Sequence, residues 1–285
     1  DLSGITASKI PFWFQHFYKP GKKIAREKDW NTKLEEIVEN AAKWDIGILV
    51  GVPAWCQLLI EKILDYHKIK NIHELWPNLT IYVHGGVSFE PYRKGFEKLL
   101  SEPLLYIETY LASEGFIAFQ KYPNQIGMSL VLDNGIFYEF VPFDESNFTS
   151  DGTIKESAET KLLGEVSIGV EYALLISTCT GAWRYLLGDV VKFVSANEII
   201  ITGRTKQFIS LCGEHLSIDN MNRAIMQVSN QFNITISEFT VVGVPFDSLF
   251  AHHWYIGTDD VVIKDLLKEA LDAAFHLSKT EGIIP

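Results

Sequence analysis

Two short blocks near the middle of the chain carry residue types that could bind a nucleotide. The first, Gly181–Asp189, places Asp189 where we expect a strand to end, and a carboxylate can accept hydrogen bonds from two adjacent hydroxyls of a ribose. The second, Ile201–Phe208, places Arg204 and Lys206 at the end of the next expected strand. Arginine is a fixed donor for ribose or phosphate oxygens, so this order of residues favours nucleotide chemistry.

Further candidates lie upstream, after other expected strands. Gly86 and Val87 follow an apolar strand, and a glycine there lets the backbone approach a planar base. Tyr110 offers a ring for stacking, while Glu114 offers a carboxylate oxygen for Mg²⁺ beside the phosphates. Each segment alone is also typical of an ordinary turn, and Gly188–Asp189 alone is compatible with a hairpin turn. Their order favours one shared cleft, since ligands bind at the carboxyl ends of strands in open α/β sheets.

Elements able to position these residues follow from the hydrophobic pattern. Residues 32–44, 54–66 and 90–100 have helical spacing and alternate with apolar strands at 46–50, 79–84 and 104–108, which predicts a mixed or parallel sheet covered by helices. From residue 116 the pattern changes to an antiparallel run. Its expected strands are 116–120, 128–132, 136–141, 163–177, 184–194 and 198–202, with a polar loop over 144–161.

The fold class that we predict is α/β with an added antiparallel β part and a small α+β unit at the C-terminus. We expect a large domain over residues 1–205, with an α/β part over 1–115 and a β-rich part over 116–205. The small domain is expected over residues 206–285, with helices at 218–230 and 262–277.

Composition excludes several classes of function. The 285 residues carry 25 basic and 36 acidic side chains, a formal net charge of −11, so a nucleic-acid or anionic-membrane surface is not expected. Three scattered cysteines without metal spacing predict reduced thiols and a cytoplasmic protein. No stretch has the length and apolar content of a membrane span.

The motifs resemble the auxin-responsive promoter family of acyl-acid amido synthetases and its bacterial relatives, within the adenylate-forming superfamily that includes firefly luciferase. The resemblance covers nearly the whole chain. It is carried by these segments: Asp1–Ile5, Gly51–Trp55, Gly85–Arg93, Tyr110–Gly115, Gly181–Val191 and Gly203–Phe208.

This resemblance implies a set of roles, residue by residue. It implies adenine contacts from Gly86, Val87 and Tyr110, α-phosphate and Mg²⁺ roles for Ser113 and Glu114, and ribose binding by Asp189 and Arg204. Lys206 falls at the superfamily's hinge. The implied ligands are ATP or AMP, Mg²⁺, a small carboxylic acid and an amino acid or other amine.

The implied reaction is ATP-dependent activation of the acid as an acyl-adenylate, followed by amide formation. The superfamily's phosphate loop and C-terminal lysine have no counterpart in these residues, so the 285-residue chain is expected to adenylate poorly. Two alternatives stay open: a CoA ligase of the same superfamily, and a non-catalytic module that binds a nucleotide or a small acid.

Overall fold

The computed structural model describes residues 10–123, 125–206, 209–211, 214–216, 218–246 and 249–280. The motif at Asp1–Ile5 and the last two residues of Gly203–Phe208 lie outside the described residues. The chain divides into two units, one of Asp1–His84 with Gly95–Tyr106 and one of Gly85–Lys94 with Ile107–Pro285. The expected domain boundary between residues 205 and 206 stays a prediction.

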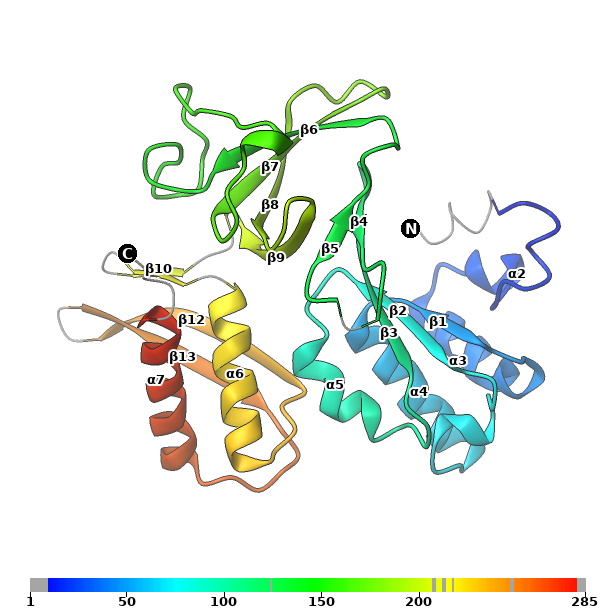
Figure 1. Ribbon diagram of the computed structural model, residues 1–285. Coiled ribbons are helices and arrows are strands. Elements are labelled where there is room, and N and C mark those ends of the chain that lie inside the picture. Colours follow the sequence, from blue (N-terminus) through cyan, green and yellow to red (C-terminus); the bar gives the residue numbers. More distant parts are fainter. Residues whose placement is uncertain are drawn as a thin grey trace. The chain divides into compact units, whose positions relative to one another are not determined.

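The first unit is the α/β part of the chain (Figure 1). Its elements are α2 (Lys22–Ala25), α3 (Trp30–Asn40), η1 (Ala41–Lys43), β1 (Ile48–Val50), α4 (Pro53–His67), η2 (Ile72–Glu74) and β2 (Ile81–Gly85). Strands β1 and β2 are parallel and are joined by α4, the usual crossover between parallel strands. Pro53 at the start of α4 and a left-handed Lys68 after it explain why the helix has these limits.

Buried side chains hold this unit together. Ile60 and Ile63 of α4 are fully buried, and the Tyr82 ring of β2 stacks on Phe96 with 4.7 Å between the ring centroids. Phe96 belongs to α5 (Glu90–Glu97), which is shared by the two units, as is β3 (Leu105–Ala112).

The second unit begins as an antiparallel sheet. Its further strands are β4 (Gly115–Phe119), β5 (Met128–Leu130), β6 (Ile136–Pro142), β7 (Glu171–Thr178), β8 (Tyr185–Phe193) and β9 (Glu198–Arg204), with one 3₁₀ turn, η3 (Leu163–Glu165). Hydrogen bonds join them in the order β3-β4-β5-β9-β8-β7-β6. Aromatic rings of Phe140, Tyr172 and Phe193 meet edge to face in its core.

The strand expected over 163–177 is wrong in its first half. Residues 163–165 form the 3₁₀ turn, Gly169 has a φ of +84°, and the strand starts only at Glu171. A left-handed glycine interrupts an extended strand, so the apolar run alone gave too early a start.

The polar segment 144–161 is irregular as expected, and Asp144 accepts hydrogen bonds from the backbone of Ser146 and Asn147.

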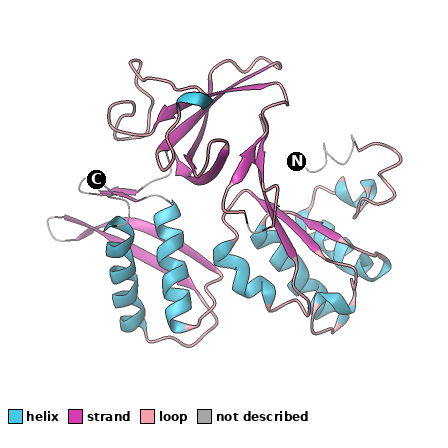
Figure 2. Ribbon diagram, viewed as in Figure 1, coloured by secondary structure: helices cyan, strands magenta, loops and turns pink. Residues whose placement is uncertain are grey.

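The C-terminal part of the second unit consists of helices on small antiparallel sheets (Figure 2). Its elements are β10 (Ile209–Leu211), β11 (Glu214–Leu216), α6 (Ile218–Phe232), β12 (Glu238–Phe246), β13 (Leu249–Gly257) and α7 (Lys264–Thr280). Ile225 and Val228 of α6 are packed with Leu271 of α7 in one apolar cluster. The predicted fold class, α/β with an antiparallel part and a small α+β part, is confirmed.

Candidate nucleotide site

Three side chains from three strands of the second unit form a hydrogen-bonded group that we call the clamp: Tyr110, Asp189 and Arg204. The Tyr110 hydroxyl on β3 donates to Oδ2 of Asp189 on β8. Arg204 Nε on β9 donates to the other oxygen, Oδ1, at 2.7 Å, and Asp189 and Arg204 face each other in the β8–β9 register. Both carboxylate oxygens therefore have a donor.

The clamp requires a strongly curled sheet. In the hydrogen-bonded order, β4, β5 and β9 stand between β3 and β8. Four steps between neighbouring strands would separate these two strands by about 19 Å in a flat sheet. Because Tyr110 and Asp189 instead share a hydrogen bond, the sheet closes back toward itself. The core inside the curl contains Tyr110, Ile117, Phe140, Phe193 and Ile199.

Irregular strand pairing sets the position of Asp189. On its β7 side the register shifts, with Leu175 opposite Leu186 and Ala173 opposite Val190, so no Cα pair is formed at Asp189. Gly188, which precedes it, has a φ of +86°, where a side chain would be strained. Such bulges redirect side chains. Asp189 thus lies inside β8, in agreement with the strand expected over 184–194. Its expected placement at a strand end, like the alternative of a Gly-Asp hairpin turn, is wrong.

The clamp residues differ greatly in burial. Tyr110 is 5% exposed and Asp189 is 7% exposed, whereas the Arg204 side chain is 53% exposed. Burial, and next the Asp189 charge, raise the pKa of the Tyr110 hydroxyl above its usual range, so the phenol stays protonated and acts as a donor. Solvent therefore reaches the clamp at Arg204, and we call this its open side.

The other predicted site residues lie in loops and turns of the same unit, and we call them the rim: Gly86, Val87, Ser113, Glu114 and Lys206. Gly86 follows β2 with a φ of +85°, and Ser113 and Glu114 form the two-residue turn between β3 and β4. Lys206 is exposed in the turn after β9. Arg204 is the last residue of β9, as predicted.

Contacts bring two parts of the rim toward Tyr110. A Cβ on Gly85 would lie 2.3 Å from the carbonyl oxygen of Thr109, so the backbone before Gly86 is pressed against the strand that carries Tyr110. The Glu114 charge acts on the Tyr110 hydroxyl and contributes to its raised pKa. We find no such contact for Val87, Ser113 or Lys206 among the described residues.

Glu114 is the sole residue that the sequence proposed as a metal ligand. In the part of the chain that the structure describes, no three His, Cys, Asp or Glu side chains gather as a metal site. A single carboxylate fits Mg²⁺ that is held chiefly by phosphate oxygens and water, which is how this ion is commonly bound beside nucleotides.

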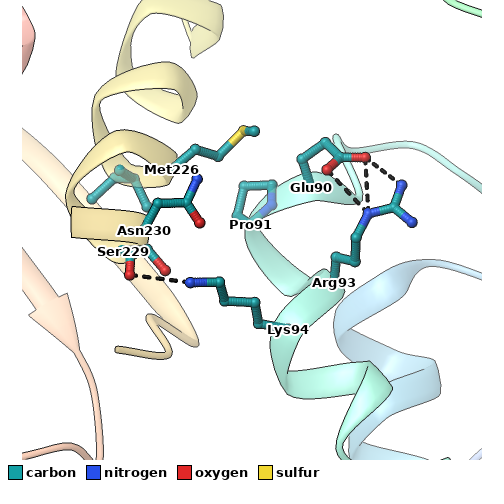
Figure 3. A pocket seen from close by; sticks show the side chains of 8 residues that line it. Glu90, Pro91, Arg93, Lys94, Met226, Ser229 and Asn230 are labelled. Carbon is teal, nitrogen blue, oxygen red and sulfur yellow. Dashed lines mark hydrogen bonds and ion pairs between the residues drawn. The ribbon is translucent and has the colours of Figure 1, made fainter. Parts of the chain in front are cut away.

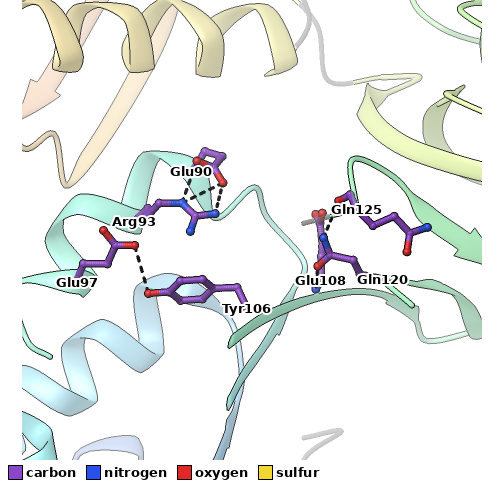
Figure 4. A network of polar contacts seen from close by, with 7 residues as sticks. All are labelled: Glu90, Arg93, Glu97, Tyr106, Glu108, Gln120 and Gln125. Atoms are coloured by element: carbon purple, nitrogen blue, oxygen red, sulfur yellow. Dashed lines mark hydrogen bonds and ion pairs between the residues drawn. The ribbon is translucent and has the colours of Figure 1, made fainter. Parts of the chain in front are cut away.

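Sequence reasoning missed two residues close to the clamp in the chain. Thr205 is buried, and its backbone N–H donates to the Gly188 carbonyl at 2.8 Å, which ties the end of β9 to the Asp189 bulge. Glu108 lies two residues before Tyr110 on β3, and its N–H donates to Gln120 (Figure 4). Burial, and next the charge of Glu90, raise the pKa of Glu108. A single glutamate in an expected strand gives no sequence signal of its burial or of its raised pKa.

A pocket elsewhere in the second unit contains none of the predicted site residues. It lies between the first turns of α5 and the end of α6, where Lys94 Nζ donates to the Ser229 carbonyl at 3.2 Å and Glu90 pairs with Arg93 (Figure 3). In the same described part of the chain, no helix combines the length and hydropathy needed to cross a bilayer.

Several curated proteins are similar to this chain. The jasmonoyl–L-amino acid synthetase JAR6 of Nicotiana attenuata is 34% identical over 126 residues, which are 42% of this chain and 21% of that protein. The indole-3-acetic acid-amido synthetase GH3.6 of Arabidopsis thaliana is 24% identical over 256 residues, 84% of this chain and 40% of that protein. The chain thus spans less than half the length of these relatives.

Solved structures share the fold. An acyl acid amido synthetase, GH3.15, matches 93% of this chain and 59% of its own with a TM-score of 0.65 and 16% identity. The anthranilate CoA ligase AuaEII, solved with anthranoyl-AMP, matches 88% of this chain and 46% of its own, with a TM-score of 0.56 and 13% identity. These two likenesses show that the chain shares the fold of these proteins.

Family models give the assignment. The GH3 family N-terminal domain matches residues 1–104, and the GH3 family central domain matches residues 129–199, the stretch from β5 to β9 that carries Asp189. The two matches together cover more than half of the chain. The resemblance predicted from the motifs is confirmed, and the chain belongs to the GH3 family.

Proposed function

We propose that this chain forms the nucleotide-binding part of a ligase that activates a carboxylic acid with ATP and transfers the acyl group to an amine. The observation that carries the proposal is the clamp, a carboxylate held by donors on both oxygens. Relatives of the chain such as JAR6 and GH3.6 are named as acid–amino acid synthetases. An amino acid is the acceptor that those names support.

The clamp suits a ribose. Each oxygen of an ionised carboxylate has two lone pairs. Tyr110 and Arg204 take one on each oxygen of Asp189, which leaves one on each for two adjacent hydroxyls. The half-exposed Arg204 guanidinium adds a positive charge on the open side, which favours a nucleotide anion. Gly86 and Val87 are proposed to face the base.

Phosphate and metal contacts are assigned to the turn between β3 and β4. Ser113, which is exposed, offers a hydroxyl, while Glu114 offers a carboxylate for Mg²⁺. When bound, Mg²⁺ neutralises charge on the phosphate oxygens. Ser113 would then bind the α-phosphate at the turn between β3 and β4.

The proposed reaction has two steps. An oxygen of the substrate carboxylate attacks the α-phosphorus of ATP and pyrophosphate leaves, a step that depends mainly on positioning and charge neutralisation. The nitrogen of the amine then attacks the acyl carbon, AMP leaves with the bonding electrons, and the amine loses a proton. Lys206, in the exposed turn after β9, is proposed as a hinge between the two steps.

We also propose that the protein is cytoplasmic and that its cysteines are reduced. Cys56 and Cys179 are free thiols, one buried and one exposed, which fits a reducing compartment.

The test is calorimetric titration of AMP into the chain and into Asp189→Ala, with Asp133→Ala as matched control because Asp133 is an exposed turn residue. We expect micromolar binding that Asp189→Ala loses and Asp133→Ala keeps. A folded wild type that does not bind AMP would refute the proposal. It would favour the alternative of a module for another small acid.

A CoA ligase and an amide-forming enzyme differ in the molecule that accepts the acyl group. The longer parent protein, given ATP and an acid, should form product with an amino acid. Product with CoA alone would support the CoA ligase alternative.

A further inference from the structure

We infer that residues 12–28 form a surface that binds an anionic lipid bilayer, with aromatic rings in the headgroup layer and basic side chains against the lipid phosphates. We call these residues the N-terminal patch. The inference goes beyond the proposed function, because the patch belongs to the first unit and contains no residue of the clamp or the rim.

The first part of the patch is a group of exposed aromatic side chains. Phe12 is 85% exposed, Trp13 65% and Phe17 72%, and Phe14 among them is 45% exposed. The backbone here is folded into successive turns, in which the Phe17 N–H donates to the Phe14 carbonyl at 3.0 Å. A contiguous group of large apolar side chains in water marks a surface that binds something.

The second part of the patch is a concentration of positive charge. Residues 19–28 contain five basic side chains and one acidic side chain, although the whole chain has a net charge of −11. The basic residues are Lys19, Lys22, Lys23, Arg26 and Lys28. The average charge of the chain therefore argues against an anionic partner in general, but not against one at this segment.

Helix α2 presents part of this charge to solvent. Its residues Ile24 and Ala25 are buried, whereas Lys23 within it and Arg26 directly after it are exposed. The buried pair fixes the helix to the first unit, so the charged side chains have a rigid support. Loss of these charges should therefore change binding without loss of the fold.

Two contacts keep the aromatic and basic parts together. Lys19 Nζ donates to the His16 carbonyl at 3.0 Å, and the His16 ring meets Phe17 edge to face with 5.5 Å between the centroids. The first ammonium group of the basic part thus lies close to the last exposed ring. Glu27 is directed to the backbone, where its Oε1 accepts from the Lys28 N–H at 2.7 Å.

This combination fits a bilayer better than a protein partner. Tryptophan and phenylalanine favour the membrane interface, and lysine and arginine are attracted to the anionic lipids of the cytoplasmic leaflet. A ring as exposed as Phe12 has almost no walls around it. It can enter a fluid headgroup layer directly, whereas a protein partner would need a separate pocket for each ring.

The experiment is co-sedimentation of the 285-residue chain with vesicles of phosphatidylcholine, alone or with about one third phosphatidylserine. We expect binding to the anionic vesicles and little binding to the neutral ones. Salt at about 0.5 M should release the chain, because it screens the lipid charge. Lys23→Gln combined with Arg26→Gln should weaken binding about 25-fold, since each basic residue contributes about fivefold.

A second variant tests the rings separately from the charge. Phe12→Ser combined with Phe17→Ser keeps every basic residue, and we expect it to weaken binding to anionic vesicles about tenfold. The charge control is Lys62→Gln combined with Lys70→Gln, two exposed lysines of the same unit, and the ring control is Tyr122→Ser, at an exposed tyrosine. Both controls should bind within about twofold of the wild type, and thermal melts check that every variant is folded.

Several outcomes would overturn the inference. These are no binding of the folded chain to anionic vesicles, equal binding to both vesicle compositions, and patch variants that bind as the controls do. Sedimentation velocity without vesicles gives a further check. A dimer that Phe12→Ser with Phe17→Ser abolishes would assign the patch to a second copy of the chain instead. AMP titration of the same variants is independent of these results, so a failure of the proposed function is detected separately.

Discussion

The two acidic side chains that strands β3 and β8 carry into the second unit, Glu108 and Asp189, are held in opposite ways. Asp189 has a donor on each oxygen, and one of these donors is a cation. Glu108 is also largely buried, but no described residue donates to its carboxylate, and the charge that acts on it is the like charge of Glu90. Desolvation of a carboxylate is tolerated when donors and an opposite charge replace water, and it is costly otherwise.

This contrast distinguishes Asp189, whose position several structural features support, from Glu108, which is buried without such support. Asp189 is supported by a bulge, a left-handed glycine and two partner strands, so several features agree on one position. Glu108 has its backbone fixed by Gln120, yet its side chain has no corresponding support. Removal of Asp189 should therefore destabilise the fold, whereas neutralisation of Glu108 should stabilise it.

The largest expected effect is a loss of stability in Asp189→Ala. The change leaves the buried Tyr110 hydroxyl without an acceptor and Arg204 without its ion pair, and we expect a cost of about 2 kcal/mol in the free energy of unfolding. Urea titration measures it, with Asp133→Ala as control. A cost below about 0.5 kcal/mol would mean that the clamp contributes little to the fold.

The next effect concerns the bulge that directs Asp189. In Gly188→Ala the new Cβ has space, since its nearest neighbour is Thr205 Oγ1 at 3.9 Å, but the φ of +86° is strained for alanine. We expect a cost of about 1–2 kcal/mol and weaker AMP binding. Gly164→Ala, with no neighbour within 4 Å and an ordinary φ, should be neutral. Equal melting temperatures for Gly188→Ala and Gly164→Ala would mean that the bulge adjusts to accept alanine.

Glu108→Gln should have the opposite sign and a smaller size. The raised pKa of Glu108 means that the folded protein holds this proton more tightly than the unfolded chain does. Stability from this group is complete below the ordinary glutamate pKa and is lost as pH rises through the raised value. Glutamine removes the penalty, so we expect the melting temperature at pH 7 to rise by about 2 °C.

The pH dependence provides the check on that interpretation. The gain in Glu108→Gln should shrink as pH falls and vanish below about 4.5, where the carboxyl is protonated in both states. A gain that persists at pH 4, or a loss at pH 7, would contradict it. Differential scanning calorimetry at several pH values measures both.

The smallest effects are expected at the rim. Lys206 and Ser113 are exposed, so Lys206→Gln and Ser113→Ala should each change the free energy of unfolding by less than about 0.5 kcal/mol. Lys206→Gln should also leave the AMP dissociation constant within about twofold. A larger change in AMP binding would show that the turn after β9 reaches the ligand.

The sequence predicted the elements and the candidate residues better than their contacts. Apolar periodicity identified α4, β2 and the antiparallel run, because each of these buries one face. The strand expected over 184–194 contains Asp189, but the sequence did not predict the bulge or the hydrogen-bond partners of this residue, since the pairing of β8 with β7 and β9 depends on residues far away in the chain.

The role of Tyr110 could not be read from spacing. A tyrosine in a strand can present a ring or a hydroxyl, and the choice depends on the curl that brings β3 to β8. Glu108 gave no signal for the same reason, because its burial comes from neighbours distant in sequence. Local patterns predict elements, whereas non-local packing decides which atoms meet.

The pairing of β5 with β9 has a kinetic consequence. Met128 lies opposite Ile199, so β6, β7 and β8 form one long excursion of the chain whose two ends meet. Closing so long a loop has an entropic cost before any contact compensates it, and such non-local pairs tend to form late in folding. A ligand bound at Asp189 contacts a site that exists only after β5 and β9 have paired. It should therefore slow unfolding far more than it speeds folding, and lengthen the lifetime of the native state.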